Sequence, residues 1–389
     1  MFENRASHNA LGPPDRSLSS MTPPAVAAFT DTYLPTVNGV TYTVKTWRER
    51  WVARGGRMDV VYPDGDHEAE SGEYPVRSLP FPFYEGYRLG VPRVPSGVAD
   101  PDVVHAHTPF SLGIAAIRTA SSRDVPLVAS YHTPTAEYAQ YLSVNGTFER
   151  RVRGVATAYE RWYLDHADVV VAPSEETARH VREDVGVSAR VEVISNGVDV
   201  DFFEPVESNF RERYDLPAGP LVGYTGRHGY EKNLELLVSA MGALDRDDVT
   251  LVFGGDGPAR ADLEAAAADA GIDAHFLGFL DRDELPEFYS ALDVFAFPSQ
   301  VETQGLVALE ANACGTPVAG VDAGALADTI VEGENGYLAG AADVEPFADA
   351  IERTLADVEA LSETCLDRRE SISVEAAIDR LESVYADLR

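Results

Sequence analysis

The segment Leu221–Asn233 places two cations, Arg227 and Lys232, in one short loop. The apolar run Leu221–Thr225 predicts a strand, and the residues after Asn233 predict a helix. Both side chains therefore leave the carboxyl end of a strand beside a helix N-terminus. Such a loop suits a bound diphosphate, because the N–H groups at a helix N-terminus attract the same negative charge. Two solvated surface cations are the alternative interpretation.

The scarcity of lysine favours a functional role for Lys232. The chain has 29 arginines but only two lysines, Lys45 and Lys232. A lysine ammonium is a compact point charge, which the planar guanidinium of arginine does not replace well. A sequence that has lost nearly every other lysine thus indicates that this position needs one.

A second candidate segment carries two carboxylates, Glu302 and Glu310, on either side of Gly305. The glycine allows close backbone approach, and the apolar residues after it predict a helix whose first N–H groups face a ligand phosphate. If the whole span were helical, the two glutamates would lie about 12 Å apart. Paired glycosidase carboxylates lie roughly 5–9.5 Å apart, so these two suit the ends of one long ligand. Two solvated glutamates are the alternative.

Short apolar runs alternate with amphipathic segments along the whole chain. This alternation predicts an α/β fold of parallel sheets covered by helices, in two doubly wound Rossmann-like domains that face each other across a cleft. Ligands of such sheets bind at the carboxyl ends of the strands. The predicted strands are Ala25–Thr30, Met58–Tyr62, Val103–His107, Leu127–Tyr131, Val169–Ala172, Val191–Ile194, Leu221–Thr225, Thr250–Gly254, His275–Leu277, Val294–Pro298 and Pro317–Val321, and the clearest helices are Leu234–Leu244, Arg260–Ala270 and Leu306–Ala313.

A polar stretch with prolines near 199–217 separates the two strand–helix series. We therefore expect an N-terminal domain at 25–203, a linker at 204–216 and a C-terminal domain at 217–372. Residues 373–389 predict a last helix that packs back on the N-terminal domain. Residues 1–24 predict a disordered tail without the apolar middle of a signal peptide, and Met21 is an alternative start to Met1.

Composition excludes several classes of protein. A net charge of −33 argues against a nucleic-acid partner, because phosphate backbones require a basic surface. Acid excess with few lysines is typical of a halophilic protein, since salt screens the self-repulsion. Cys314 and Cys365 give neither a disulfide framework nor metal-ligand spacing, which favours a reducing interior. No apolar stretch reaches the about 20 residues that cross a bilayer.

Several motifs together resemble one enzyme family, the retaining GT-B glycosyltransferases of family 4. In the C-terminal half the similar motifs are Gly226-Arg-x4-Lys232 and Glu302-x7-Glu310, the latter followed by Ala311–Val318. In the N-terminal half they are Phe29–Val40, Val103–Phe110, Tyr131–Thr133 and Ser195–Asp199. The likeness runs from about residue 25 to the end of the chain.

The resemblance implies a nucleotide-sugar site in the C-terminal domain, with the acceptor on the N-terminal side. Arg227 and Lys232 would clamp the donor diphosphate and stabilise it as it leaves. Glu302 would hydrogen-bond the hydroxyls of the transferred sugar, and Glu310 would hold the ribose diol. Backbone N–H groups near four residues would also meet sugar and phosphate: Gln304, Gly305, Leu306 and Val307.

Further positions around the donor are implied in the same way. The backbone of Phe279 and Leu280 would meet the nucleobase, Gly39 would lie against the phosphates, and His132 would lie near the transferring sugar. The sequence departs from the family at Asn233, where glycine is common after the lysine. We expect this asparagine to alter the loop geometry without removing the charge.

No metal ion and no cofactor beyond the donor substrate are expected. Asp-x-Asp pairs, the metal pattern of the other major glycosyltransferase fold, recur by chance in so acidic a chain. His105 and His107 alternate on a predicted strand and so face the same side. A metal pair is one interpretation, but the sequence places no third ligand. Strand-end packing is preferred, with His107 near enough to the strand end to border the cleft.

The N-terminal half is the less acidic one. Residues 1–200 hold 25 acids against 19 Lys and Arg, and residues 201–389 hold 39 against 12. Val40, Val44, Trp47 and Trp51 recur as a core-facing stripe. Around them lie basic residues that either are solvated or meet lipid headgroups: Lys45, Arg48, Arg50, Arg54 and Arg57, with Arg150, Arg151 and Arg153 further on. We thus expect a cytoplasmic protein, with peripheral contact to the inner face of the membrane as a further hypothesis.

These patterns predict a hexosyltransferase that uses a UDP- or GDP-linked sugar. Thr108–Gly113, Tyr131–Thr133 and Glu302–Gly305 are most similar to family members that glycosylate membrane lipids of the diacylglycerol type. The aromatic segment Ser78–Tyr84 either lines the acceptor site or packs. A mannosyltransferase that extends a polyprenol-linked or soluble glycan is the second reading. Two alternatives come from other classes. They are a sugar-nucleotide epimerase, which needs no acceptor, and a non-catalytic sugar-nucleotide-binding protein, which need not keep both cations.

Overall fold

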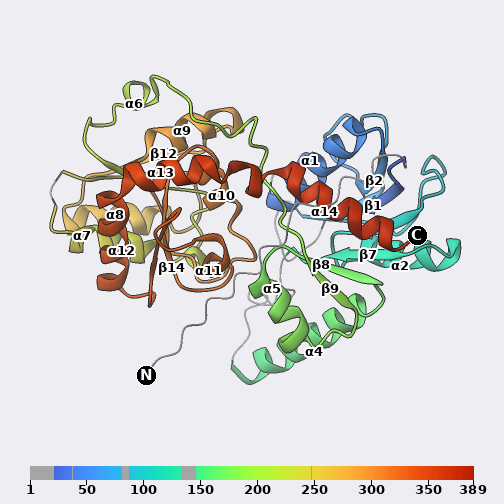
Figure 1. Ribbon diagram of the computed structural model, residues 1–389. Helices are drawn as coiled ribbons and strands as arrows, with labels where there is room; N and C mark the ends of the chain where they lie inside the picture. Colours follow the sequence, from blue (N-terminus) through green and yellow to red (C-terminus); the bar gives the residue numbers. More distant parts are fainter. Residues whose placement is uncertain (1–21, 37, 81–86, 133–145, 247) are drawn as a thin grey trace, which may run out of the picture.

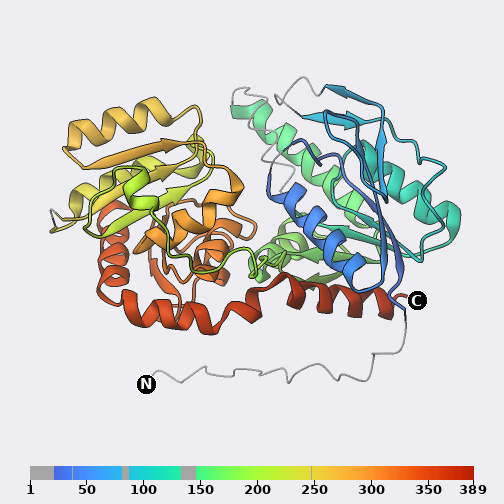
Figure 2. The same ribbon diagram turned by 90° about the horizontal axis from the view of Figure 1, so that it is seen from above.

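The computed structural model describes residues 22–36, 38–80, 87–132, 146–246 and 248–389, with only the backbone for 146–153. These residues form two α/β domains that lie side by side (Figure 1). Viewed at right angles, the helical segments at the C-terminal end of the sequence run along one side of both domains, and the last helix lies against the N-terminal domain (Figure 2). The predicted fold class, two Rossmann-like domains with parallel sheets, is confirmed.

The N-terminal domain is built on a seven-stranded sheet in the order β3-β2-β1-β6-β7-β8-β9, in which every pairing is parallel. Its central strands are fully buried because helices cover both faces, which explains their near-continuous apolar sequences. The strands are β1 (Ala25–Phe29), β2 (Arg57–Pro63), β3 (Glu73–Val76), β6 (Val103–Ala106), β7 (Leu127–Ser130), β8 (Val169–Ala172) and β9 (Arg190–Val193), with a hairpin of β4 (Ser78–Pro80) and β5 (Arg88–Gly90). The helices are α1 (Gly39–Ala53), α2 (Ser111–Arg123), α4 (Gly146–Leu164) and α5 (Glu175–Arg179), the last continued by a π-helical turn, His180–Val185.

The C-terminal domain has a six-stranded parallel sheet in the order β12-β11-β10-β13-β14-β15. The strands are β10 (Leu221–Thr225), β11 (Thr250–Gly254), β12 (Ala274–Gly278), β13 (Val294–Phe297), β14 (Val318–Val321) and β15 (Gly336–Ala339). The helices are α6 (Phe210–Arg213), α7 (Leu234–Ala243), α8 (Arg260–Ala270), α9 (Leu285–Ala291), α10 (Leu306–Ala313), α11 (Leu326–Thr329), α12 (Val344–Ala356) and α13 (Val358–Asp367). The 3-10 turns are Tyr230–Lys232, Arg282–Glu284 and Arg369–Ile372.

The strand order of each sheet reverses at one point. In the N-terminal domain the reversal lies between β1 and β6, and in the C-terminal domain between β10 and β13. Loops leave the carboxyl ends of the two strands in opposite directions at such a point, which opens a crevice where ligands bind. The fold alone thus places the expected ligand beside the loops that follow these four strands.

The last helix, α14 (Val374–Asp387), belongs to the core of the N-terminal domain. Ile378, Leu381 and Tyr385 are fully buried in one cluster with Trp47 and Trp51 of α1. The chain therefore crosses between the domains twice, after β9 and again before α14 (Figure 2).

Both crossings lie together and are joined by hydrogen bonds. Val198 N–H donates to the Ile372 carbonyl at 2.9 Å, and Val374 N–H donates to the Val198 carbonyl at 2.8 Å. Gly197 has a φ of +75°, and a Cβ at that position would lie 2.5 Å from the Cα of Val374. Glycine is therefore required where the two crossings touch.

The expected linker 204–216 is not a loose connection. Phe210 and Leu216 are buried in the core of the C-terminal domain, together with Phe203 just before the segment. The prolines and charges of this stretch led to the interpretation as a linker, but its few apolar side chains bury surface against β10 and α9 and so order the segment.

Candidate active site

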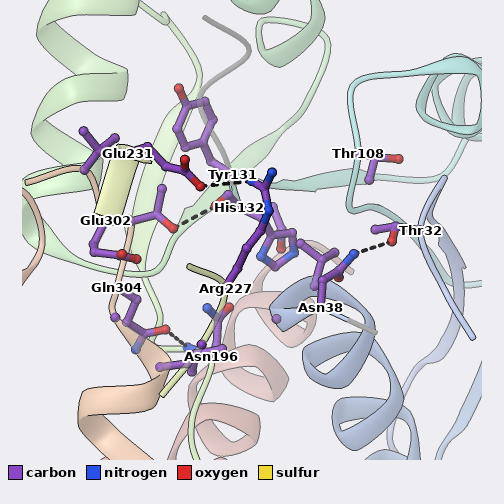
Figure 3. A pocket seen from close by; sticks show the side chains of 18 of the residues that line it. Thr32, Asn38, Thr108, Tyr131, His132, Asn196, Arg227, Glu231, Glu302 and Gln304 are labelled. Carbon is purple, nitrogen blue, oxygen red and sulfur yellow. Dashed lines mark hydrogen bonds and ion pairs between the residues drawn. The ribbon is translucent and has the colours of Figure 1, made fainter. Parts of the chain in front are cut away.

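A pocket of about 770 Å³ lies between the domains at both reversal points (Figure 3). Its walls come from loops at the carboxyl ends of β1, β6 and β7 in one domain and of β10 and β13 in the other. Nine of the predicted site residues line it: Gly39, His132, Arg227, Lys232, Glu302, Gln304, Gly305, Leu306 and Val307. The volume lies within the range of roughly 300–1,000 Å³ that is usual for small-molecule sites.

Both predicted cations reach the pocket, and each contacts a carboxylate. Arg227 Nη1 lies 3.0 Å from Glu231 Oε1 (Figure 3). Lys232 Nζ lies 2.6 Å from Glu302 Oε1. The Lys232–Glu302 pair is the less exposed of the two, with side-chain exposures of 24% and 14%. An entering diphosphate would compete with these carboxylates for the two positive charges.

His228, a buried residue that the sequence motifs did not single out, anchors the loop that carries the two cations. His228 is fully buried, and its Nε2 lies 3.2 Å from the carbonyl oxygen of Gly254. Its main-chain N–H donates to the Asp256 carbonyl at 2.9 Å. Asn233 closes the loop with φ +54° and ψ +36°, the left-handed region that glycine adopts most easily and asparagine tolerates. The asparagine thus keeps a backbone conformation that is open to glycine.

Helix N-termini from the two domains meet at the pocket. Gly39 begins α1, where the Asn38 side chain caps the helix by accepting from Thr41 N–H at 2.9 Å. Leu306 begins α10 after Gly305, whose φ of +76° requires glycine. A Cβ on Gly39 would lie 3.4 Å from Leu306 Cδ1, so the two termini are close neighbours across the cleft. Their aligned dipoles add positive potential to the two side-chain cations.

His132 is held by a stack of buried histidines. Its Nε2 lies 3.1 Å from Nδ1 of His107, and the two rings are parallel to within 14°. His107 stacks in turn on His105, whose Nδ1 lies 2.5 Å from the Tyr385 hydroxyl of α14. Burial lowers the pKa of His132 to about 4 and that of His107 well below its usual value. Both rings are therefore neutral near pH 7.

The expectation that His105 and His107 share one side of their strand is confirmed, and His107 borders the pocket as expected. Within the described part of the chain no group of three His, Cys, Asp or Glu side chains has the arrangement of a metal site. Metal independence stays a prediction.

Asp31 is a buried carboxylate that sequence analysis did not single out. It follows β1 and accepts hydrogen bonds from the Ser111 hydroxyl at 2.8 Å, Leu112 N–H at 2.9 Å and the Thr108 hydroxyl at 3.0 Å. Burial raises the pKa of Asp31, and these donors partly offset the effect. Its position at the end of a strand was the one sequence signal. The carboxylate fixes the start of α2 and the loop that forms the N-terminal-domain side of the pocket.

Three predicted donor residues lie outside the pocket. Phe279 is 72% exposed at the end of β12, whereas Leu280 is buried beneath Gly254. Glu310 lies one turn into α10, and its Oε2 accepts from the Tyr289 hydroxyl at 2.8 Å. Burial raises the pKa of Glu310 to about 7. The implied contacts of these residues with ribose and base stay predictions.

The basic residues of α1 and the strand after it are paired, which argues against their forming a lipid-binding patch. Arg48 contacts Glu73, Arg50 contacts Asp199, Arg54 contacts Asp379, Lys45 contacts Glu49, and Arg57 contacts Asp59. The side chains of Arg150, Arg151 and Arg153, most of the segment Ser78–Tyr84 and residues 1–21 lie outside the described residues. No helix that the structure describes is long and apolar enough to span a bilayer.

Two parallel-sheet domains that enclose a cation-lined pocket at their strand reversals define the GT-B class of glycosyltransferases. Comparison with known proteins agrees. Residues 207–369 match the model described as glycosyl transferases group 1, and residues 37–202 match that of Glycosyltransferase Family 4. The chain belongs to this family of glycosyltransferases.

Among curated relatives, a GDP-mannose-dependent alpha-mannosyltransferase of Corynebacterium glutamicum is 32% identical over 94% of this chain and 89% of its own. A sulfoquinovosyl transferase of Arabidopsis thaliana is 35% identical over 73% of this chain, which spans 56% of that relative. An alpha-monoglucosyldiacylglycerol synthase of Streptococcus pneumoniae is 29% identical over 75% of this chain and 70% of its own.

Among solved structures, a sucrose-phosphate synthase of Thermosynechococcus elongatus superposes with a TM-score of 0.76 at 23% identity. The superposition covers 94% of this chain and 98% of the synthase. At this identity the likeness supports the GT-B fold, which agrees with the family assignment.

Proposed function

We propose that this protein transfers a hexose from a UDP- or GDP-linked sugar to a hydroxyl of a membrane lipid, with retention of anomeric configuration and without a metal ion. One observation carries the proposal. Two cations, Arg227 and Lys232, and two helix N-termini, at Gly39 and Leu306, converge on one pocket from both domains. Such a cluster of positive potential suits a pyrophosphate, with no divalent ion needed to neutralise it.

The electrostatics also account for rate acceleration. When the bond between the sugar C1 and the phosphate oxygen breaks, its electron pair stays with the departing diphosphate and the sugar becomes oxocarbenium-like. Arg227 and Lys232 are held in place before the reaction, so they stabilise that growing charge without reorganisation. Glu302 would then hold the sugar hydroxyls, and His132 would face the sugar as a neutral imidazole.

The acceptor proposal rests on the relatives and on the surface of the N-terminal domain. The synthase of Streptococcus pneumoniae is named for a glycosylated diacylglycerol. In this chain, helix α4 exposes 71% of Val155 and 47% of Trp162. An apolar residue and a tryptophan on one amphipathic helix suit the headgroup region of a membrane. Peripheral membrane contact would therefore use α4 rather than α1, whose cations are paired.

A second candidate is mannosyl transfer from GDP-mannose to a polyprenol-linked or soluble glycan. A GDP-mannose-dependent alpha-mannosyltransferase aligns with 94% of this chain. The two candidates share the diphosphate site and differ in nucleobase, sugar and acceptor.

The deciding experiment incubates the purified protein with radiolabelled UDP- and GDP-hexoses, with and without total lipid extract. We expect label in the lipid phase with one donor, and proton NMR of the product should show the anomeric configuration of the donor. Label in a water-soluble glycan would favour the second candidate. Donor conversion at the same rate without any acceptor would indicate an epimerase, and no conversion of any donor would indicate a binding protein.

A chelator tests the metal-free part of the proposal. We expect the rate to be unchanged in excess EDTA, because the protein supplies the positive charges that a divalent ion would otherwise supply. Strong inhibition that is reversed by added Mg²⁺ or Mn²⁺ would contradict it. The Lys232→Ala variant, treated in the same way, shows whether a metal can replace the missing ammonium.

A further inference from the structure

Thr303 lies between Glu302 and the start of α10, and both its side chain and its main chain contact the opposite domain. Its hydroxyl donates a hydrogen bond of 2.8 Å to the main-chain carbonyl of His132. Its own carbonyl accepts from the hydroxyls of Ser174 and Thr177, each at 2.9 Å. The residue next to the donor-side glutamate is thus tied to the acceptor-side histidine.

The hydroxyls of Ser174 and Thr177 lie close together beside the Thr303 carbonyl. Ser174 is the N-cap of α5, and its oxygen accepts from the Thr177 N–H at 3.1 Å. The one hydroxyl proton of Ser174 has two acceptors in reach, the Thr303 carbonyl and Thr177 Oγ1, each at 2.9 Å, and the Thr177 hydroxyl donates to the same carbonyl. Ser174 is 5% exposed and Thr177 is 5% exposed, so water competes little for these bonds.

Gln304 adds contacts to the residues that follow a third strand of the opposite domain, β9. Its Oε1 accepts from the Asn196 N–H at 3.0 Å, and its Nε2 donates to the Ser195 hydroxyl at 2.5 Å (Figure 3). Its side chain is buried between the domains. The loop Glu302–Gly305 is thus held by residues that follow β7, β8 and β9, the second half of the N-terminal sheet.

Glu302 and His132 come from different domains, so their separation depends on how the domains are placed. The ring of His132 is fixed within its own domain by His107, at 3.1 Å. Its main chain is fixed from the other domain by Thr303. A displacement of about 1 Å in such a constellation can lower a rate about 100-fold, because reacting groups must be aligned closely.

We propose that Thr303 is a positioning residue, which sets the place of His132 relative to Glu302 and so completes the site only when the two domains are closed. This inference rests on the proposed transferase function. The loop that carries Glu302 then contacts His132 only in the closed arrangement of the domains. In an open cleft, the sugar would have no aligned acceptor.

Two substitutions separate the hydroxyl from the shape of Thr303. Thr303→Val keeps the branched side chain but removes the donor, and Thr303→Ser keeps the donor. We expect Thr303→Val to lower kcat about 10- to 100-fold, and Thr303→Ser to restore most of it. The dissociation constant of UDP or GDP, measured by calorimetry, should stay within about twofold, because Arg227 and Lys232 are untouched. Equal rates in wild type and Thr303→Val would overturn the proposal.

Asp328 provides a matched control. Its Oδ2 accepts from the Glu176 N–H at 2.6 Å, an exposed contact between the same two domains that does not reach the pocket. Asp328→Ala should leave kcat unchanged. If Asp328→Ala were as slow as Thr303→Val, any loss of interdomain contact would suffice and Thr303 would have no special role.

A double-mutant cycle tests whether Thr303 acts through His132. Thr303→Val combined with His132→Ala should be no slower than His132→Ala alone, because the histidine ring that Thr303 positions is then gone. If the two substitutions lowered kcat by independent factors that multiply in the double variant, the proposal would be contradicted. If the wild-type protein transfers no sugar to any acceptor, that result contradicts the proposed function and not the role of Thr303 in particular.

A crystal structure of Thr303→Val with bound UDP or GDP gives a readout that does not depend on turnover. The inference expects His132 to move away from Glu302 in that variant, and an unchanged distance would overturn it.

Discussion

Lys232 and Glu302 form an ion pair at 2.6 Å, within the pocket that the family resemblance assigns to the donor. A donor diphosphate would take over the ammonium and leave the carboxylate to bind sugar hydroxyls. Both groups thus stay ordered before the ligand arrives, which limits the entropy lost on binding.

Replacing Lys232 tests the central electrostatic claim. We expect Lys232→Ala to lower kcat/KM at least about 100-fold, equivalent to about 3–4 kcal/mol, since one fixed cation of the transition state is lost. Steady-state kinetics measure the loss, and circular dichroism should show an unchanged fold. The other lysine is the control: Lys45 pairs with Glu49 on the surface of α1, so Lys45→Ala should keep full activity. Near-normal turnover in Lys232→Ala would refute the assignment.

Through Glu310, we expect donor binding to depend on pH. Burial raises its pKa from 4.5 to about 7, so the carboxyl becomes neutral as the pH falls through 7. Charge-assisted hydrogen bonds are about twice as strong as neutral ones, so the KM for donor should rise between pH 8 and pH 6. In Glu310→Gln the KM should be higher at pH 8 and flat with pH. A wild-type KM that is constant over this range would contradict a ribose-binding carboxylate here.

Glu310 should also affect stability, and here the favourable form is the protonated one, whereas donor binding favours the ionised one. A raised pKa in the folded state means that the carboxyl contributes stability fully below pH 4.5, and that this contribution is lost as the pH rises through about 7. Glu310→Gln removes the buried charge and keeps an acceptor for the Tyr289 hydroxyl. Its melting temperature relative to wild type should therefore be higher at pH 8 than at pH 5.

Sequence analysis found the residues that carry charge or glycine in recognisable spacing, and nine of them line one pocket. It could not find Thr303, whose partner His132 is 171 positions away in the chain, or Asp31, whose partner Thr108 is 77 positions away. Threonine and aspartate are common, and nothing in their local sequence says which distant groups they meet.

Among the elements, each of the eleven predicted strands has a counterpart in the two sheets. Fully buried parallel strands are nearly continuous apolar runs, which makes them easy to find. Two strands of the large parallel sheets were missed, both at edges, and so were the two strands of the β4–β5 hairpin. β3 (Glu73–Val76) contains Pro75, which an edge strand tolerates, and β15 (Gly336–Ala339) is short and begins with glycine.

The two segments that cross between the domains touch at Gly197, and a substitution there tests how much this contact contributes to stability. Gly197→Ala adds a Cβ that would lie 2.5 Å from Val374 Cα, at a φ of +75°. We expect the free energy of unfolding to fall by about 2–3 kcal/mol, from backbone strain and overpacking together. Gly271→Ala is the matched control, because Gly271 has a φ of +68° but nothing within 4 Å of its Cβ position.

Strain alone should lower the stability of Gly271→Ala by only about 1 kcal/mol. Urea unfolding measures both variants. If the two substitutions were equally costly, the contact between the crossings would contribute nothing to stability.

For the whole molecule, the dominant property is a net charge of −33. Raising the salt concentration from about 0.1 M to about 1 M shortens the Debye length from about 10 Å to about 3 Å and so weakens self-repulsion. We therefore expect the melting temperature to rise over this range of KCl in scanning calorimetry. Sucrose at similar osmolality is the control: an equal rise would point to solvent exclusion instead of screening.

Two domains that face each other across a cleft were predicted from the chain, but the contacts that fix their relative placement were not. Periodicity within a segment is local, whereas the pocket depends on Gly39 facing Leu306 across the cleft. The same holds for the segment 204–216, which was predicted to be a linker. Its sequence does not tell that Phe210 is buried in the core of the C-terminal domain.

The placement of α14 has a consequence for biosynthesis. The N-terminal sheet can form early during translation, but Trp51 and the rest of that core face are covered by a helix that follows the whole C-terminal domain in the sequence. Residues 374–387 must therefore be synthesised before this face leaves water. Until then the nascent domain presents aromatic surface to chaperones, although every strand of its sheet has already been made.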